Sequence, residues 1–195
     1  MRRVGDTDLF EYRAPPGELP AQYLVIRESD DGSRTEFEDP YSFWPQLEPE
    51  AMEAFHAGKH CHAQNLLGAR RHTVDGLEGT LFGVWAPNAG RVSVIGDFNG
   101  WDGRRHPMRQ HAGPGIWELF IPRLLEGRYK YEIRNARSGD LLVKADPFAA
   151  SAEYRPGTAS QICGPPQHGW QDQDWQSRKA QASWHDRPMS VYEVH

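Results

Sequence analysis

The chain has 195 residues, of which 38% are hydrophobic and 25% charged, with a net charge of −5 and a pI near 6.0. Seven Trp, seven Tyr and eight Phe exclude a disordered chain, and the acidic balance disfavours nucleic acid or an anionic membrane as a partner. No apolar run approaches the roughly 18 residues of a membrane span and no hydrophobic signal core follows the first residues, so a cytoplasmic location is expected.

The first segment, residues 1–46, reads as a partial β-module because its pattern recurs later in the chain. Five pieces return 107 positions on without a gap: Phe10-Glu11 as Trp117-Glu118, Pro15 as Pro122, Ile26-Arg27 as Ile133-Arg134, Gly32 as Gly139, and Asp39-Pro40-Tyr41 as Asp146-Pro147-Phe148. The shared pattern is strand, proline exit, strand, glycine turn and Asp-Pro-aromatic corner. Only nine residues precede Phe10, so we expect a first module that is truncated or shortened, without its opening strands.

Residues 47–78 are predicted to form a short helix and a connector. The helix is expected over 49–57, with Pro49 in its first turn and Gly58 at its end. Residues 59–78 show no comparable periodicity and are expected to connect this helix to the next domain.

A metal site is the alternative for four side chains in this segment, which are His56, His60, Cys61 and His62. A structural zinc site needs four ligands at defined spacing, and Gly58 interrupts any helix that would bring His56 and His60 to one face. No metal is therefore expected. Cys61 and Cys163 are too few and too far apart for a disulfide framework, which favours two reduced thiols.

Residues 79–163 are predicted to form the complete domain, an all-β sandwich. Strands are expected near 81–85, 91–95, 115–121, 129–134 and 141–144, separated by turn residues such as Asn99-Gly100. Alternation places Tyr129, Tyr131 and Ile133 on one face of a strand, with Lys130 and Glu132 on the other; in the same way Trp117, Leu119 and Ile121 oppose Glu118 and Phe120. Four large aromatics are expected in the core: Trp85, Trp117, Tyr129 and Tyr131.

The loop after the second of these strands carries Trp101 and is the candidate binding site. A flat indole can lie against the C–H face of a sugar ring, while Asn99, Asp102 and Arg104 can hydrogen-bond its hydroxyls. The alternative is that the Trp101 ring packs against the sandwich edge or a neighbouring domain. Arg104-Arg105-His106 could be read as a basic patch, but the adjacent Asp97 and Asp102 favour a solvated turn.

The last segment, residues 164–195, is predicted to be a polar linker that ends in SVYEVH. Its composition suits a connection over a neighbouring domain, with Trp170, Trp175 and Trp184 as anchors. A lone parallel strand has no partner of its own, so the final six residues are expected to be disordered or to pair elsewhere.

An ordered set of motifs carries a family resemblance over most of the chain: DPYSF (39–43), LLGAR (66–70), GVWAPNAGRVSVIGDFNGWDGRRHPM (83–108), GIWELFIP (115–122), YKYEI (129–133), KADPFA (144–149), RPGTASQIC (155–163) and SVYEVH (190–195). In this order they resemble the amino-terminal part of bacterial 1,4-α-glucan branching enzymes. The resemblance implies an immunoglobulin-like β-sandwich of the family-48 carbohydrate-binding type, preceded by the partial β-module. It also implies a following (β/α)8 catalytic barrel whose first strand is SVYEVH.

The resemblance further implies a binding surface for glycogen or another α-1,4-glucan. Trp101 and Lys130 resemble the tryptophan and lysine that contact glucan in such modules, and Asn99 is the third candidate. Two positions depart from the pattern, because Leu141-Leu142 stand near a second stacking tryptophan and Ser160 replaces a sugar-binding asparagine. The barrel is the other implied partner, within the same protein.

Catalysis is not expected from these 195 residues. Branching cleaves an α-1,4 bond through a glycosyl-enzyme intermediate, and retaining chemistry needs two carboxyl groups about 5 Å apart. The resemblance puts both on barrel strands beyond His195. None of the module's own carboxylates matches a catalytic position, among them Asp97, Asp102, Glu118, Glu132 and Asp146. No cofactor is expected.

Two other functions stay open at this stage. Debranching and trehalose-releasing relatives join a similar module to a barrel with a similar YEVH strand, although the FNGWDGRRHPM run argues against them. A stand-alone glycogen-binding protein would end in a folded element at His195 and bind glucan by itself.

Overall fold

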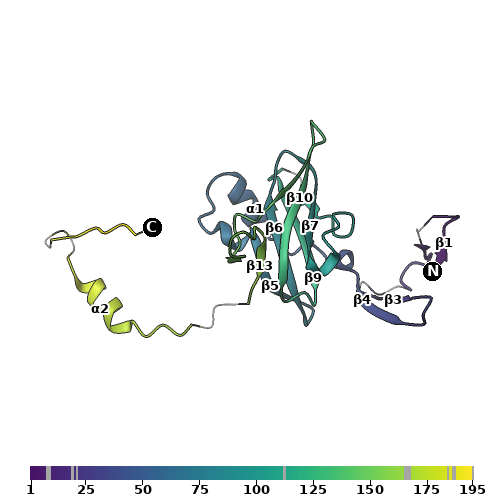
Figure 1. Ribbon diagram of the computed structural model, residues 1–195, viewed down its shortest axis with the longest axis horizontal. Coiled ribbons are helices and arrows are strands. Elements are labelled where there is room, and N and C mark those ends of the chain that lie inside the picture. Colours follow the sequence, from purple (N-terminus) through teal and green to yellow (C-terminus); the bar gives the residue numbers. More distant parts are fainter. Residues whose placement is uncertain are drawn as a thin grey trace. The chain divides into compact units, whose positions relative to one another are not determined.

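The computed structural model describes residues 1–7, 10–18, 20, 22–111, 113–164, 168–183, 185 and 188–194. The chain divides into two units, Met1–Gly164 and a shorter carboxyl-terminal one from residue 165. The larger unit contains a β-sandwich with two hairpins ahead of it, and the smaller contains one helix (Figure 1).

The sandwich consists of two antiparallel sheets. The first has the order β5 (Gly68–Val74), β6 (Leu77–Trp85), β9 (Ile116–Pro122) and β8 (Arg109–His111). In the second, β10 (Gly127–Asn135) is central and pairs with three strands: β7 (Ala89–Gly96), β11 (Leu141–Lys144) and β13 (Ser160–Ile162); β13 also pairs with β12 (Ser151–Ala152). Each of the five predicted strands matches an observed one, and the all-β, immunoglobulin-like prediction is confirmed.

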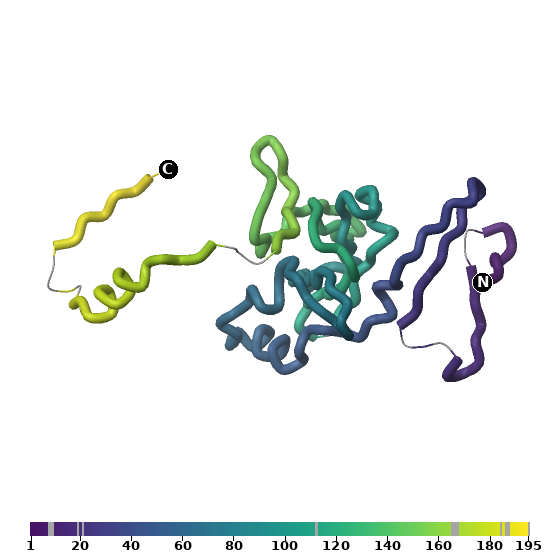
Figure 2. Tube along the Cα trace, turned by 90° about the horizontal axis from the view of Figure 1, so that it is seen from below, coloured from purple at the N-terminus to yellow at the C-terminus, as the bar shows by residue number. Residues whose placement is uncertain are grey.

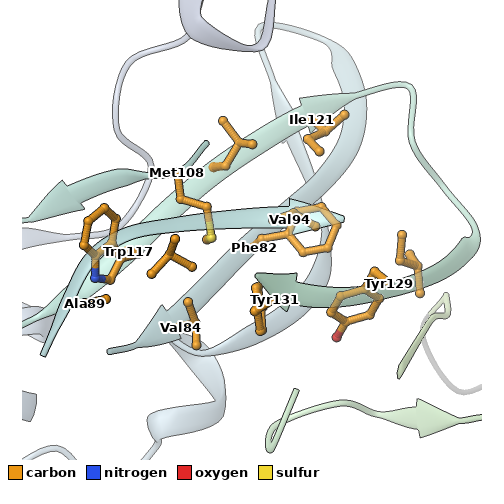
Figure 3. Packing of buried hydrophobic residues seen from close by; sticks show 12 residues of the cluster. Phe82, Val84, Ala89, Val94, Met108, Trp117, Ile121, Tyr129 and Tyr131 are labelled. Atoms are coloured by element: carbon orange, nitrogen blue, oxygen red, sulfur yellow. The ribbon is translucent and has the colours of Figure 1, made fainter. Parts of the chain in front are cut away.

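The core lies between the two sheets and is rich in aromatic rings (Figure 3). Phe82, Tyr129 and Tyr131 are at most 1% exposed, and their rings meet edge to face at 5.2 and 5.8 Å between centroids. Trp117 is 4% exposed, so three of the four aromatics predicted in the core are confirmed.

Trp85 was wrongly predicted as a core residue, since it is 55% exposed at the end of β6. Its indole Nε1 donates to the Pro114 carbonyl oxygen at 3.1 Å, and its ring lies 6.2 Å from Phe55. The alternation that buries Phe82 and Val84 turns the side chain of Trp85 away from the inter-sheet core.

The outer face of the β5–β6–β9–β8 sheet carries a second core. Helix α1 (Pro49–His56), the 3₁₀ turn η2 (Ala63–Asn65) and the residues beside them cover Leu81, Ile116 and Phe120 with side chains such as Phe43, Leu47 and Met52. Strand β9 is therefore buried on both faces. Glu118 and Phe120 lie opposite Trp117, Leu119 and Ile121, as the alternation predicted, and are themselves only 1% and 3% exposed.

The sandwich begins earlier than the predicted boundary at residue 79. Strand β5 pairs with β6 from Gly68↔Gly83 to Val74↔Leu77, so part of the predicted connector belongs to the sheet. This strand was not predicted because three consecutive polar residues, Arg70-Arg71-His72, interrupt any alternation of apolar and polar side chains. Helix α1 ends one residue before its predicted end.

Before the sandwich lie two short antiparallel pairs, β1 (Arg2–Arg3) with β2 (Phe10–Glu11), and β3 (Leu24–Glu28) with β4 (Arg34–Glu38). Figure 2 shows β3 and β4 side by side in dark blue. Arg123 binds Glu38 at 2.6 Å, and Tyr41, in the 3₁₀ turn η1 (Pro40–Ser42), donates its hydroxyl to the Pro107 carbonyl at 2.9 Å. These contacts attach the second hairpin to the sandwich.

The smaller unit contains α2 (Gln173–Gln181) where a linker was predicted. Trp175 is 47% exposed and lies 4.9 Å from the Lys179 ammonium, and Trp170 is 72% exposed. Residues 188–194 form neither helix nor strand. Trp184 and His195, both part of the predictions for this segment, lie outside the described residues.

Candidate functional site

Trp101 stands at the end of a tight loop after β7. The 3₁₀ turn η3 (Asp97–Asn99) leads to Gly100 and Trp101, whose φ values are 65° and 60°. The Trp101 amide donates to the Gly96 carbonyl at 3.0 Å. A non-glycine residue in this left-handed region is strained by about 1 kcal/mol or more. The position of the Trp101 side chain is therefore maintained at a cost in folding free energy. The residue stays 38% exposed.

A chain of polar contacts holds the Trp101 ring. Its Nε1 donates to Asp97 Oδ1 at 3.2 Å, and Asp97 in turn accepts from the Arg128 guanidinium at 2.9 and 3.0 Å. Arg128 also binds Glu153 at 3.0 Å. The hydrogen bond from Arg128 lowers the pKa of Asp97, which keeps it charged. The roles of Asp97 and Arg128 in holding the Trp101 ring were not predicted from the sequence. The available signal was that Arg128 lies two residues from Lys130 and therefore on the same face of the strand.

Lys130 lies on the same face of the second sheet as this chain of contacts. Side chains two residues apart on a strand share a face, so Lys130 projects on the side of Arg128, away from the buried Tyr129 and Tyr131. Lys130 Nζ donates to Thr158 Oγ1 at 2.7 Å. The structure thus brings the Trp101 loop and Lys130 to one outer face, which we call the Trp101 face, defined by Trp101, Asp97, Arg128, Lys130 and Thr158.

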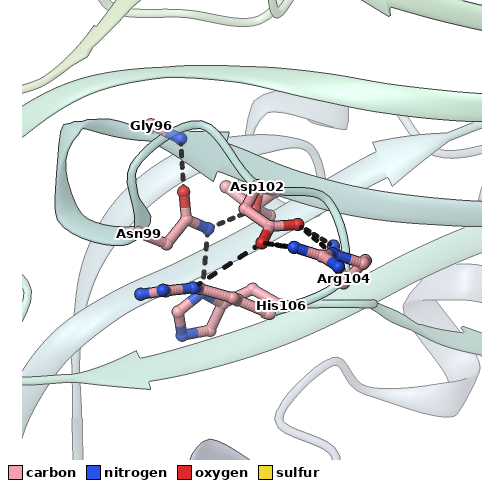
Figure 4. Close-up of polar contacts among 7 residues, drawn as sticks. Gly96, Asn99, Asp102, Arg104 and His106 are labelled. Atoms are coloured by element: carbon pink, nitrogen blue, oxygen red, sulfur yellow. Dashed lines mark hydrogen bonds and ion pairs between the residues drawn. The ribbon is translucent and has the colours of Figure 1, made fainter.

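Asn99 is buried beneath the loop, whereas contact with a sugar would require an exposed side chain. It is 2% exposed; its Oδ1 accepts from the Gly96 amide at 2.9 Å, and its Nδ2 donates to the Val94 carbonyl and to His106 Nδ1, both at 2.9 Å (Figure 4). Every hydrogen-bonding group of this amide is engaged inside the protein. Asn99 supports the loop below Trp101, and burial lowers the pKa of His106 so that it stays a neutral acceptor.

Asp102 and Arg104 lie at the surface of the loop and bind each other. The Arg104 guanidinium donates to both Asp102 oxygens, at 2.8 to 3.2 Å (Figure 4). These hydrogen bonds lower the pKa of Asp102, and Arg105 lies 3.8 Å from the same carboxylate. The Asp102 carboxylate offsets positive charge in Arg104-Arg105-His106. This agrees with the interpretation of the segment as a solvated turn and not a basic patch.

The two positions that depart from the family pattern have different environments. Leu141 and Leu142, on β11, are 49% and 43% exposed, so they remain open to a partner. Ser160 is 1% exposed and its Oγ accepts from the Asp146 amide at 2.9 Å. Ser160 therefore serves the sandwich interior.

Within the part of the chain that the structure describes, no group of three or more His, Cys, Asp or Glu side chains is placed to hold a metal ion. Cys61 and Cys163 are both free. No helix among the described residues is both long and apolar enough to cross a bilayer.

The fold and the Trp101 loop agree with a match to a known family of modules. Residues 66–149 match the family described as carbohydrate-binding module 48, the isoamylase N-terminal domain. This segment holds β5 to β11 and the whole Trp101 loop, so the sandwich is similar to the modules of this family over most of its strands.

The whole chain aligns with 1,4-alpha-glucan branching enzymes. It is 44% identical over 196 aligned positions to GlgB of Cellvibrio japonicus, covering 100% of this chain and 27% of that protein. It is 50% identical over 178 positions to GlgB of Pseudomonas aeruginosa, covering 91% of this chain and 24% of that protein. The chain aligns with the amino-terminal part of these enzymes, and it spans about a quarter of the length of the curated relatives it matches.

Among solved structures, a pullulanase of Group B Streptococcus in complex with maltotetraose overlaps with a TM-score of 0.40 at 24% identity, over 54% of this chain and 15% of that one.

Proposed function

We propose that this chain is the α-glucan-binding part of a branching enzyme, and that the Trp101 face makes the contact. The observation that carries the proposal is the placement of Trp101: its backbone is strained and its ring is tethered through Asp97, yet 38% of the residue is left open to solvent. Backbone strain of this kind clusters at ligand-binding sites, and here it accompanies a tethered ring that remains accessible to solvent.

The chemistry of this face suits a neutral glucose polymer. The Trp101 ring can stack on the apolar C–H face of a glucose unit, and the tether to Asp97 limits the entropy lost on binding. Lys130 and Thr158 lie on the same side of the sheet, bonded to each other, and can exchange that bond for sugar hydroxyls.

Branch formation by the whole protein is part of the proposal: cleavage of an α-1,4-glucan and transfer of the segment to a 6-hydroxyl. Several carboxylates of the module are already engaged, Asp97 by Arg128, Asp102 by Arg104 and Glu118 by His111. We therefore expect this chain alone to show no transferase activity. A cytoplasmic location, where both thiols would stay reduced, remains a prediction.

Docking to a catalytic barrel is a second candidate role, favoured by β11. Leu141, Leu142 and Val143 are each 43–49% exposed on this edge strand, and contiguous exposed apolar side chains mark interaction surfaces. Both roles can coexist, since β11 borders β10 and leaves the Trp101 loop free.

Affinity electrophoresis in gels with and without glycogen tests the proposal. We expect glycogen to retard the wild-type chain and the Trp101→Ala variant to migrate freely. The matched control is Trp44→Ala, because Trp44 is 79% exposed outside the Trp101 face, and it should be retarded like wild type. Circular dichroism checks that each variant is folded. Equal retardation of Trp101→Ala and wild type would reject the Trp101 face as the glucan contact. No retardation of folded wild type would reject glucan binding by this chain and favour docking.

A further inference from the structure

Tyr154 lies in the loop between β12 and β13, residues 153–159, and is 97% exposed. A single exposed aromatic side chain is common on protein surfaces. This one differs in its setting, because its loop is closed by internal hydrogen bonds and is attached to the Trp101 face.

The loop is closed by contacts of its own residues. The Glu153 amide donates to the Ala159 carbonyl at 2.9 Å, and the Ala159 amide donates to the Glu153 carboxylate at 2.9 Å. This second bond lowers the pKa of Glu153, so the carboxyl group stays charged. The Gly157 amide donates to the Tyr154 carbonyl at 2.9 Å and forms a tight turn, and a Cβ at Gly157 would lie 2.7 Å from the Cβ of Glu153. The backbone on both sides of Tyr154 is therefore held in place.

Both sides of the loop are attached to β10. Before Tyr154, the Glu153 carboxylate accepts from the Arg128 guanidinium at 3.0 Å. After it, the Thr158 hydroxyl accepts from the Lys130 ammonium at 2.7 Å. Arg128 and Lys130 share the outer face of the second sheet, so the loop with Tyr154 borders the Trp101 face.

The Arg128 guanidinium lies between the attachments of two aromatic residues. On one side it binds Asp97, which accepts from the Trp101 indole at 3.2 Å, and on the other it binds Glu153, the sequence neighbour of Tyr154. Trp101 follows β7, and Tyr154 precedes β13, on the opposite edge of β10. Two hydrogen bonds and the width of a guanidinium separate the two carboxylates, so a ligand that reaches both rings is longer than one glucose unit.

We propose that Tyr154 is a second stacking platform of the Trp101 face, which then binds several consecutive units of one α-glucan chain and prefers long chains to short ones. This role of Tyr154 rests on the proposed binding of glucan by that face. A phenol ring, like an indole, offers an apolar surface to the C–H face of a sugar, and its fixed backbone limits the entropy lost on binding. A ligand that contacts two linked platforms binds more tightly than one that contacts either alone.

Isothermal titration calorimetry with maltose and with maltoheptaose tests this role. We expect the wild-type chain to bind maltoheptaose about tenfold more tightly than maltose, because only the longer sugar reaches both platforms. Tyr154→Ala should weaken the binding of maltoheptaose about fivefold and leave that of maltose unchanged. Tyr154→Phe keeps the ring, so it should bind both sugars as wild type does.

Tyr192→Ala is the matched control, since Tyr192 is 90% exposed in the smaller unit, and it should also bind like wild type. Trp101→Ala should lose the binding of both sugars. Circular dichroism checks that each variant is folded.

The outcomes separate the second platform from the proposed function. If Trp101→Ala loses binding while Tyr154→Ala keeps the wild-type affinity for maltoheptaose, the second platform is rejected and the proposed function stands. An equal loss in Tyr154→Phe and Tyr154→Ala would reject stacking by the ring. No binding of either sugar by the folded wild-type chain would reject the proposed function and the role of Tyr154 together.

Discussion

The hairpins β3–β4 and β10–β11 share local sequence signals but differ in what covers them. In both, a glycine with positive φ, Gly32 at 80° or Gly139 at 76°, makes the turn. In both, an aspartate Oδ1 then accepts the amide two residues on: Asp39 from Tyr41 at 2.9 Å, and Asp146 from Phe148 at 2.8 Å. Ile26 is nevertheless 49% exposed, whereas Ile133 packs against the main core.

The corner aspartates extend the likeness, because each also binds a tyrosine hydroxyl. Tyr23 donates to Asp39, which raises the pKa of Tyr23 to about 12, while Tyr129 donates to Asp146 at 2.7 Å. The same local sequence pattern therefore produces the same glycine turn and aspartate corner in both hairpins. Burial depends on neighbouring strands and on a facing sheet. Among the described residues, β10 has both, because it pairs with β7 and β13 and shares a core with the other sheet, whereas β3 pairs with β4.

The largest expected difference concerns the aromatic pair Phe10 and Trp117, which occupy equivalent positions of the repeat. Trp117 is 4% exposed and Phe10 is 60% exposed. Trp117→Ala should lower the free energy of unfolding by about 3–5 kcal/mol, and Phe10→Ala should change it by less than about 0.5 kcal/mol. Urea titration followed by circular dichroism measures both. Similar losses for the two variants would mean that the first copy also rests on a core.

The corner aspartates should differ next. Asp146 accepts from the Tyr129 and Tyr131 hydroxyls and from the Phe148 amide in the interior. Asp146→Ala removes an acceptor from all three and leaves Tyr131 only the Gly83 carbonyl at 3.4 Å, so it should cost about 3 kcal/mol. Asp39→Ala, at the half-buried corner, should cost less than about 1 kcal/mol. The same urea titration applies, and a cost for Asp39→Ala equal to that for Asp146→Ala would contradict the comparison.

A pH effect should be confined to the sandwich. Burial lowers the pKa of His106 from 6.5, so the unfolded chain takes up the proton more readily than the folded one. The stability contributed by neutral His106 is then complete above about pH 6.5 and is lost as the pH falls. His106→Gln, which keeps an acceptor for Asn99, should weaken this loss between about pH 7 and pH 5.

The hairpin β3–β4 contains no histidine, so its local opening should not follow this pH dependence. Hydrogen exchange of its amides, compared with urea unfolding at each pH, separates the two regions. If the free energy of unfolding of His106→Gln depends on pH as steeply as that of wild type, another group causes the effect. His72 is one example, because burial also lowers its pKa.

The smallest expected effect concerns the turn glycines. A Cβ added at Gly32 or Gly139 would meet no atom within 4 Å, so alanine acts there through backbone strain alone, about 1 kcal/mol. Gly139→Ala should lower the free energy of unfolding of the sandwich by that amount, and its midpoint in urea falls accordingly. Gly32→Ala should leave the midpoint unchanged and loosen only the hairpin amides in hydrogen exchange. A shift of the midpoint by Gly32→Ala would show that the hairpin unfolds together with the sandwich.

The sequence allowed the sandwich to be predicted where strand alternation is strong. Tyr129 and Tyr131 were placed correctly because β10 has one buried and one outer face. Strand β9 departs from that pattern, since α1 and the residues beside it cover its second face. Its nearly continuous apolar run, Ile116–Pro122 with Glu118 as the one charged residue, is the signal that could have indicated burial on both faces. Strand β5 was missed because its side chains are polar and half-buried.

The candidate site could be predicted only in part. Trp101 and Lys130 were recognisable from residue type and position, and the structure places them on one outer face. Whether an asparagine beside a tight turn faces a ligand or the turn itself depends on tertiary contacts, here with Val94, Gly96 and His106. The Asp97–Arg128 pair links residues 31 positions apart, beyond the range of a local pattern.

A titration of the ¹⁵N-labelled chain with maltoheptaose, a linear α-1,4-glucan, tests the central claim most directly. The account predicts saturable shifts at the Trp101 indole and at Lys130 and Thr158, with none in residues 24–38, and their loss in Trp101→Ala. Shifts confined to β11 or to the β3–β4 hairpin, or no shift in the folded chain, would contradict it.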